Sequence, residues 1–463
     1  MKQYINKYFS IFFGALLFFA TQGFAQESYL LKELRIPQVA QENPGAIIPY
    51  DAHISFPGLG KIHFGLNLPC AYGDLFDISD KFLKNVSKSN AVRTRTWFEL
   101  DPIHFGFRSG KNYFSITTAI KMDMGMTLQK DLFALVIEGN EKERTIVKND
   151  FLSMNMYAEF GLGYNREVNE NFSFGVNAKY LTGFFNAHTK KANLTLRPGE
   201  NFHELILNGD LDGKFACIYD IYGEFESNDD DSRNNEFSFS ASDFFKNHGF
   251  SFDLGARYKI NDMFEVSASV LDIGLIKWKT SAREIKSSNN PFYFRGYEFE
   301  GNIFEDFNDK KLDEQVKEYF KEVGDSLLNH YDSDIEEVPS YTKWLNTKFN
   351  VGFSFYATKK DRFNLNFRGL FINSMFVPSG SVSYTRNCGK WFDVVIGNTF
   401  KENSLLNPGL GLNLTLNVFQ IYAAVDYINS IYIDRLKNVN VVVGINFVAP
   451  LRENRTFKAS LPY

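Results

Sequence analysis

The chain has 463 residues and a formal net charge of −5, and 16% of its residues are aromatic. This mildly acidic balance argues against nucleic acid as a partner, because domains that bind nucleic acid carry an excess of basic side chains. The three cysteines, Cys70, Cys217 and Cys388, are odd in number and lack metal-ligand spacing. We expect free thiols, with one disulfide as the alternative.

Residues 1–25 have the pattern of a secretory signal peptide. Lys2 and Lys7 supply positive charge, residues 11–20 are apolar, and a small-x-small cleavage pattern ends at Ala25. An N-terminal membrane helix is the alternative, but the apolar stretch is short and ends in polar residues. No later run approaches the about 18 apolar residues that a spanning helix needs. We therefore expect an exported chain without a helical anchor.

Residues 26–51 combine apolar side chains with three prolines and precede the first predicted strand. Such a segment is too short for a domain and too apolar for a free tail, so it needs cover from the rest of the chain. Its apolar residues are Leu30, Leu31, Leu34, Ile36, Val39, Ile47 and Ile48.

Residues 52–449 are predicted to form strands. Segments of about ten residues place apolar side chains at every second position, as at Phe172, Phe174 and Val176, with Ser173 and Asn177 on the other face. Because successive side chains of a strand point to opposite faces, each segment has one apolar and one polar side. Counting from a first strand within residues 53–68 to a last one at 438–447 gives about fourteen.

One predicted strand changes register. Phe98 and Leu100 share a face, and the alternation resumes at Ile103 after Asp101 and Pro102. Proline cannot donate a hydrogen bond to the neighbouring strand, so we expect a bulge or a kink at this point.

The connections between strands alternate between short and long. Short ones lie at 108–112, 165–170, 259–262, 357–362 and 387–390 and near 417. Longer ones lie at 129–150, 184–248, 277–346, 376–379, 401–407 and 430–437. Single-chain barrels of bacterial outer membranes sort their connections in this way, with short periplasmic turns and long extracellular loops.

We therefore predict an all-β fold, a transmembrane outer-membrane β-barrel of about 14 antiparallel strands in a Gram-negative bacterium. The barrel must close, because open strand edges in hydrocarbon would leave backbone groups unpaired. Residues 26–51 are predicted as an N-terminal plug, with a position across the periplasmic opening as the alternative. Residues 450–463 are predicted as a tail, which places both termini in the periplasm. Residues 302–329 have helical spacing and are predicted as an extracellular loop helix.

Ionisable side chains on the polar strand faces would point into the lumen, where they are candidates for function. The plainer alternative is that they pair with one another, since both signs are present. The candidate channel residues are Pro102, Lys121, Asp123, Lys179, Arg257 and Arg368, and Glu159, Asp253 and Glu265 point the same way. Catalytic motifs are missing from the sequence, so we predict that the protein is not an enzyme and has no cofactor and no metal.

Short motifs resemble a known superfamily. Asn43, Pro44 and Gly45 resemble the Asn-Pro-Ala motif in the N-terminal hatch of FadL-type long-chain fatty-acid transporters, although the third residue is glycine here. The hairpin with Phe160 and Asn171 and the pattern from Leu271 to Trp278 are also similar to FadL-like proteins, which include the type IX secretion protein PorV. The resemblance is strongest to an uncharacterised outer-membrane family with a domain of unknown function.

The resemblance implies passive uptake of a hydrophobic or amphipathic small molecule, with Asn43, Pro44 and Gly45 in the hatch and a gap in the wall near Pro102. The alternative is a barrel that does not transport but binds a secreted or surface protein, as PorV-like proteins would imply. The predicted partners are thus outer-membrane lipid, a hydrophobic ligand and a protein partner.

Overall fold

The computed structural model describes residues 28–68, 91–132, 134, 142–149, 151–199, 204–218, 245–287, 291–294, 326, 330, 334–372, 375–400, 406–428 and 438–450. The predicted signal peptide and the tail after residue 450 lie outside them, as does nearly all of the predicted loop helix at 302–329. None of the described helices is long and apolar enough to cross a membrane.

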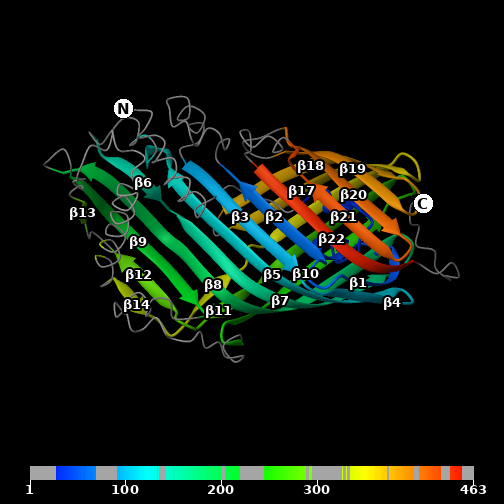
Figure 1. Cartoon of the computed structure of the whole chain (residues 1–463), viewed down its shortest axis with the longest axis horizontal. Helices are drawn as coiled ribbons and strands as arrows, with labels where there is room; N and C mark the ends of the chain where they lie inside the picture. The colour runs from blue at the N-terminus through cyan, green and yellow to red at the C-terminus, as the bar shows by residue number, and fades with distance from the viewer. Residues whose placement is uncertain are drawn as a thin grey trace, which may run out of the picture.

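The described strands form a closed antiparallel barrel with fourteen positions in its wall (Figure 1). The ring closes because β22 pairs with β1 and β2, for example at Ile62 and Val443. Three positions hold two labelled strands each: β1 (Tyr50–Ser55) with β2 (Lys61–Asn67), β3 (Ala91–Asp101) with β4 (His104–Ser109), and β15 (Tyr341–Trp344) with β16 (Lys348–Tyr356). The other eleven are β5 (Asn112–Gln129), β7 (Leu152–Glu167), β8 (Phe172–Pro198), β10 (His248–Lys259), β11 (Phe264–Trp278), β17 (Asp361–Ile372), β18 (Met375–Asn387), β19 (Phe392–Phe400), β20 (Pro408–Leu416), β21 (Phe419–Val425) and β22 (Asn438–Pro450).

The outer face of the wall is apolar and the inner face is polar, which confirms the alternation predicted from the sequence. On β10, Phe250 and Phe252 are at least half exposed, whereas the intervening Ser251 and Asp253 are fully buried. An apolar outer band matches the hydrocarbon layer of a membrane. Closure of the barrel lets the backbone groups of the wall pair with neighbouring strands, so that no open edge faces hydrocarbon. The predicted transmembrane barrel of about fourteen strands is therefore confirmed.

An extension stands beyond the barrel end where the long connections lie, built on the far half of β8 (Figure 1). The far half of β8 pairs with β9 (Leu205–Cys217) and β6 (Arg144–Lys148). In turn, β9 pairs with β12 (Arg283–Ser287) and β13 (Phe292–Phe294), and β12 with β14 (Ile335–Glu337). The connections predicted as loops at 184–248 and 277–346 therefore contain paired strands. The connection predicted at 376–379 lies within β18 instead, where Phe376 pairs with Phe371.

The short turns gather at the opposite end of the barrel, at the positions predicted from the sequence. This short-turn end also holds both ends of the described wall, since Tyr50 pairs with Pro450 a few residues beyond the pairing of Phe419 with Phe447.

Residues 28–49, here called the inner segment, lie in the lumen. They include η1 (Leu31–Glu33) and α2 (Val39–Glu42) and are hydrogen-bonded to strands around the ring, such as β7 through Asn165, β8 through Ser173 and β22 through Asn446. Leu30, Leu31 and Ile36 are fully buried. Burying this apolar surface stabilises the barrel interior, at roughly 25 cal/mol per Å².

Wall glycines make room for the inner segment. Gly175 and Gly255 face the carbonyl oxygen of Pro44 and the side-chain oxygen of Asn43, and a Cβ atom at either glycine would collide with them. Gly45 in turn lies against the backbone of Ala256, where a Cβ atom would approach the Ala256 Cα to 2.6 Å. The motif at residues 43–45 is thus seated in a cradle that larger side chains would fill.

We predict that Gly255→Val displaces the inner segment, because the new side chain occupies the place of Asn43. Trypsin should then cleave after Lys32 or Arg35 in the purified protein, whereas the wild type stays protected. The control is Gly380→Val, since the nearest atom to a Cβ at Gly380 is 3.3 Å away. Equal protection of both variants would contradict this seating.

Candidate functional site

The centre of the lumen is organised by a bulge in β11. The pairing with β10 skips a residue between Phe252 and Leu254, so that two residues of β11, Leu271 and Asp272, stand opposite Asp253. Asp272 has a φ of 58°, in the left-handed region that aspartate and asparagine tolerate better than most residues. The bulge changes the alternation, and Leu271 and Asp272 are both buried on the inner side.

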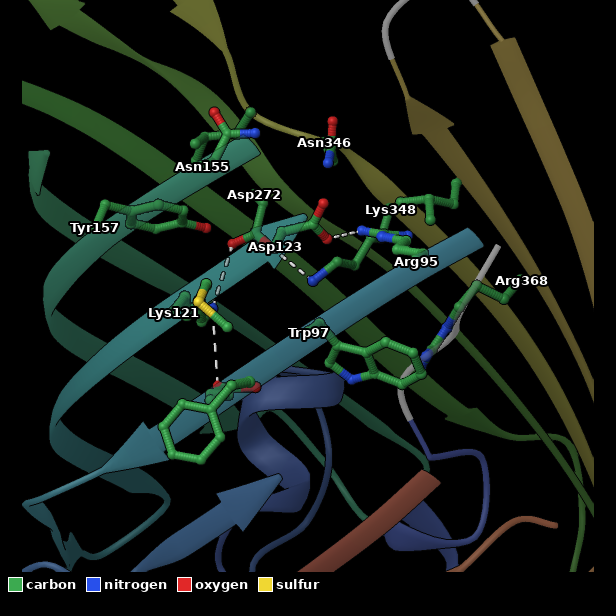
Figure 2. A pocket seen from close by; sticks show the side chains of 15 residues that line it. Arg95, Trp97, Lys121, Asp123, Asn155, Tyr157, Asp272, Asn346, Lys348 and Arg368 are labelled. Carbon is green, nitrogen blue, oxygen red and sulfur yellow. Dashed lines mark hydrogen bonds and ion pairs between the residues drawn. The ribbon is translucent and has the colours of Figure 1, made fainter. Parts of the chain in front are cut away.

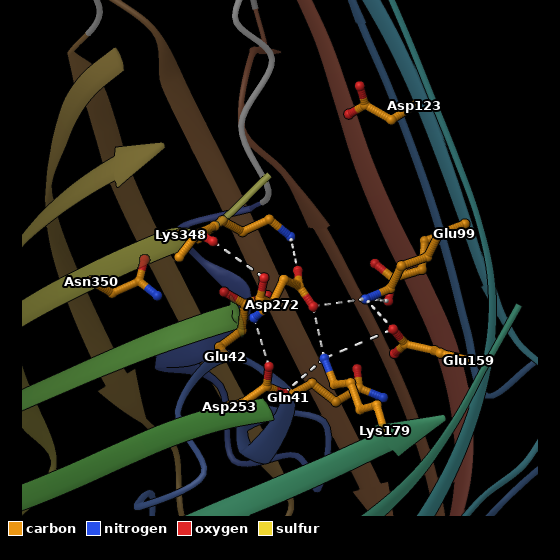
Figure 3. Close-up of polar contacts among 12 residues, drawn as sticks. Gln41, Glu42, Glu99, Asp123, Glu159, Lys179, Asp253, Asp272, Lys348 and Asn350 are labelled. Atoms are coloured by element: carbon orange, nitrogen blue, oxygen red, sulfur yellow. Dashed lines mark hydrogen bonds and ion pairs between the residues drawn. The ribbon is translucent and has the colours of Figure 1, made fainter. Parts of the chain in front are cut away.

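Asp272 is the hub of a cluster of ion pairs that we call the lumen network (Figure 3). Its carboxylate oxygens lie 2.9 Å from the ammonium nitrogens of Lys179 and Lys348, and 3.9 Å from that of Lys121. Lys179 also lies 2.8 Å from Asp253. Lysines from β5, β8 and β16 therefore meet at one carboxylate of β11.

The network continues toward the wall of β2 and β3. Glu99 is 2.8 Å from Lys61 and 3.8 Å from Lys121. Lys121 in turn is 3.0 Å from Glu159. Four lysines thus share this buried region with five carboxylates, those of Glu99, Asp101, Glu159, Asp253 and Asp272. Buried charged groups require this kind of pairing, because an isolated one would become neutral by gaining or losing a proton, or would destabilise the fold.

The inner segment joins the network through α2. Gln41 accepts a hydrogen bond from Lys61 at 2.6 Å and donates one to Asp101 at 2.5 Å. Glu42 is 2.5 Å from the guanidinium of Arg368, whose Nε donates to Asn350. Arg368 is only 1% exposed, so this pair forms in a region that excludes water.

A cavity lies beside the network on its long-loop side (Figure 2). It encloses about 710 Å³, part of which is open to solvent. Its apolar lining includes Trp97, Tyr157, Leu345 and Leu370. Its charged lining consists of Arg95, Glu99, Lys121, Asp123, Asp272, Lys348 and Arg368. Apolar walls with a few polar groups are the lining expected of a site for a small amphipathic molecule.

The structure brings together some of the residues predicted from the sequence and separates others. Lys121, Asp123 and Arg368 line this lumen cavity, and Asp123 forms an ion pair with Arg95. Lys179 lies in the network below it. Arg257 is elsewhere, near the short-turn end, where it pairs with Glu265 at 2.5 Å. Asn43, Pro44 and Gly45 lie in the wall cradle described above rather than in the cavity.

Pro102 lies at a break in the wall, as its position in the sequence predicts. It separates β3 from β4, and residues 56–60 separate β1 from β2 beside it. The gap is bridged, because Gly58 N–H donates to the Pro102 carbonyl at 3.1 Å and Phe56 N–H donates to Ile445 at 2.9 Å. The wall is therefore irregular but hydrogen-bonded at this point.

The main members of the network that sequence reasoning missed are Glu42, Lys61, Glu99, Asp272 and Lys348. Glu99 could have been found, because the outward positions of Phe98 and Leu100 place their neighbour inward. Asp272 could not, because regular alternation from Glu265 would place it on the lipid side. Among the described residues, no group of three or more possible metal ligands could hold an ion.

Comparison with known proteins identifies the family. A model of a family of unknown function, DUF5723, matches residues 44–426. The chain belongs to this family. No curated protein sequence matches the chain.

Solved outer-membrane channels share similarity with this DUF5723 member. The toluene transporter TbuX of Ralstonia pickettii is 9% identical, with a TM-score of 0.45 over 90% of this chain and 94% of that one. A Pseudomonas aeruginosa FadL homologue is 9% identical, with a TM-score of 0.40 over 90% and 95%. The toluene transporter TodX of Pseudomonas putida is 8% identical, with a TM-score of 0.37 over 92% and 94%.

We predict that Asp272→Asn destabilises the barrel, because it leaves three lysines around a neutral side chain. Asparagine tolerates the same backbone conformation, so the substitution removes the charge without straining the backbone. Removing one partner of a buried ion pair costs about 3–5 kcal/mol. The free energy of unfolding, measured by urea titration of the folded protein in vesicles, should fall by that amount.

The control for this change is Asp262→Asn. Asp262 also pairs with a lysine, Lys259, but its side chain is 98% exposed. Exposed ion pairs contribute little, so this variant should unfold like the wild type. Equal stability of the two variants would show that the network does not hold the lumen together.

Proposed function

We propose that the protein is a passive outer-membrane channel for a hydrophobic or amphipathic small molecule. The lumen cavity supports this, because Trp97, Tyr157 and Leu370 offer apolar contacts beside the ammonium of Lys348 and the guanidinium of Arg95. An elongated molecule with an apolar body and one polar end would satisfy both halves of the lining.

In this proposal the inner segment is the plug. It lies on the short-turn side of the cavity and contacts the wall all around, so a ligand in the cavity meets it before reaching the other end. Hydrogen bonds and ion pairs, among them those of Gln38, Gln41 and Glu42, and the apolar packing of Leu30 and its neighbours hold the segment to the wall. Passage requires the segment to shift, or the ligand to leave sideways.

The sideways route would pass the break at Pro102. Residues 56–60 close this break with a few backbone hydrogen bonds, so a small displacement of that turn would open the wall toward lipid. An apolar ligand gains from such an exit, because it passes from the lumen to hydrocarbon without crossing water.

We also propose the orientation. The short-turn end faces the periplasm of a Gram-negative bacterium, with both termini there, and the extension of β8 and β9 faces outward. The sorting of short and long connections to opposite ends supports this orientation.

We predict that locking the plug stops flux. The Cβ of Leu30 lies 3.5 Å from the position of a Cβ at Gly411, within the range that a disulfide spans. Leu30→Cys with Gly411→Cys should therefore crosslink the inner segment to β20 on oxidation. In liposomes with a labelled long-chain fatty acid outside, uptake should fall to that of protein-free vesicles and return when a reductant is added.

Each single cysteine variant, treated with the same oxidant, is the control and should keep wild-type uptake. Uptake by the locked form equal to that of the reduced form would show that the segment does not gate passage. Uptake by the wild type no faster than by protein-free vesicles would contradict the transport proposal for this ligand class.

A barrel that binds a protein partner without transporting is the second candidate, and the charge-paired, occupied lumen favours it. The extension would be the binding surface. Its strands are joined by Glu284, which lies 2.7 Å from Lys190, 2.9 Å from Lys286 and 3.2 Å from Lys214. Hydrogen bonds from Lys190, then Lys286, lower the pKa of Glu284 to about 2.

Glu284→Lys tests this second candidate, because it places a fourth positive charge among three lysines. We expect the purified variant to keep the heat-dependent gel mobility of a folded barrel but to lose a partner that wild-type protein captures from the cell surface. Asp262→Lys, at the other end of the barrel, makes the same charge change and should still capture it. Capture by both variants would exclude the extension as the binding surface.

A further inference from the structure

A second cavity lies on the other side of the inner segment, toward the short-turn end. It has a volume of about 980 Å³, part of which is open to solvent, between this segment and strands β10, β11, β16 and β17. It shares no lining residue with the lumen cavity. Its apolar lining comes from the inner segment itself, at Leu34, Val39, Ala46, Ile47 and Pro49.

The charges in this lower cavity do not balance. Its three arginines each have a carboxylate partner: Arg35 with Asp393 at 2.5 Å, Arg257 with Glu265 at 2.5 Å, and Arg362 with Glu33 at 2.9 Å. Lys32 has no such partner among the described residues. Its ammonium lies 5.3 Å from the centre of the Tyr29 ring, a contact that leaves its hydrogen-bonding capacity unused.

Hydrogen-bond donors are also in excess there. The Nε atoms of Arg35 and Arg362 are buried and find no acceptor within the described part of the chain. A buried donor without an acceptor is unfavourable, so an acceptor-rich guest would stabilise these groups and Lys32.

We propose that the lower cavity is a binding site for a small amphiphile with an oxyanion head, a carboxylate or a phosphate monoester, and that Lys32 forms the ion pair with that head. The three arginines are held in place by their own carboxylates and surround the head with donors. The aliphatic side chains of the inner segment take up the apolar tail. The site opens toward the short-turn end and does not depend on whether the barrel transports.

The electrostatics of Lys32 fit this role. The pKa of Lys32 is lowered to about 8, chiefly by burial and then by the charge of Arg368, against the opposing effect of Glu33, Glu42 and Asp426. The amine is thus poised to lose its proton just above neutral pH. A bound oxyanion would favour the ammonium form, so anion binding should weaken as the pH rises through about 8 and strengthen below it.

Calorimetry of the full-length protein in detergent micelles tests the site with three probes: hexanoate, hexyl phosphate and 1-hexanol. We expect the wild type to bind at least one of the two anions and to bind hexanol much more weakly. Comparison of the two anions identifies the head group. Lys32→Gln should bind at least tenfold more weakly, the equivalent of losing one charge-assisted hydrogen bond. Lys32→Arg should restore binding and remove its decline between pH 7 and 9.

A further variant is the control. Lys359→Gln removes an exposed lysine from the short turn after β16 and should bind like the wild type. Unchanged anion binding by Lys32→Gln would overturn the proposal, as would equal binding of hexanol and hexanoate.

Protection from chemical modification gives a second measurement that does not need a folded variant. Trinitrobenzenesulfonate labelling of Lys32 in the wild type, followed by mass spectrometry, should be slowed by the bound anion and not by hexanol. Unslowed labelling at saturating anion would contradict the role of Lys32. Neither experiment measures flux, so a failed transport assay would not decide whether this site binds an anion.

Discussion

Charge matching inside the barrel is the constraint on which the rest of the structure depends. A wall strand that turns its apolar side to lipid must turn its polar side to the lumen, and here that side carries lysines from four separate strands. In a region that excludes water such charges are tolerated only with partners close by. The bulge in β11 supplies the central partner by turning Asp272 inward, and the inner segment supplies Gln41 and Glu42. Wall, bulge and segment are therefore parts of one electrostatic unit.

The inner segment also solves a problem of volume. Eight strands enclose a space that side chains of the wall can just fill, and fourteen enclose more than that. Residues 28–49 occupy part of the surplus, and glycines on β8, β10 and β20 let their backbone and side chains approach the wall closely. The remaining space includes the lumen cavity and the lower cavity, which lie on opposite sides of the segment. The two cavities differ in charge, since the one on the long-loop side is lined by the network and the lower one contains Lys32, which has no carboxylate partner in the described part of the chain.

The sequence was sufficient for the barrel and for much of its interior. Alternation with a period of two, together with the sorting of turn lengths, predicts the strands, the closure and the inward direction of Lys121, Lys179 and Arg368. It could not predict which of these charges meet, because partners such as Glu42 and Arg368 are more than 300 residues apart. It also failed where the period is broken. Asp272 lies after a bulge that exchanges the two faces of β11, and Lys61 lies in a strand whose register the neighbouring turn at residues 56–60 obscures.

The strands within the long connections could not be predicted from the sequence, for a different reason. A strand that has left the membrane no longer needs one apolar face, so β9 and β12 lack the alternation that reveals the wall strands. Arg257 was grouped with the lumen charges because side-chain direction alone does not tell depth along the barrel. The distance of Arg257 from the network depends on how the strands lie side by side in the barrel.

The length of β8 has a consequence for what the protein meets first. Its 27 residues span about 90 Å at about 3.3 Å per residue, whereas the hydrocarbon layer is about 30 Å thick. Even with the tilt of about 40° common in such barrels, the strand stands tens of ångströms clear of the lipid. The far half of β8 therefore stands outside the membrane as part of the extension, where it is hydrogen-bonded to β9 along its length. In the proposed orientation, a large molecule diffusing toward the outer surface of the membrane would touch this extension before it reached the mouth of the barrel.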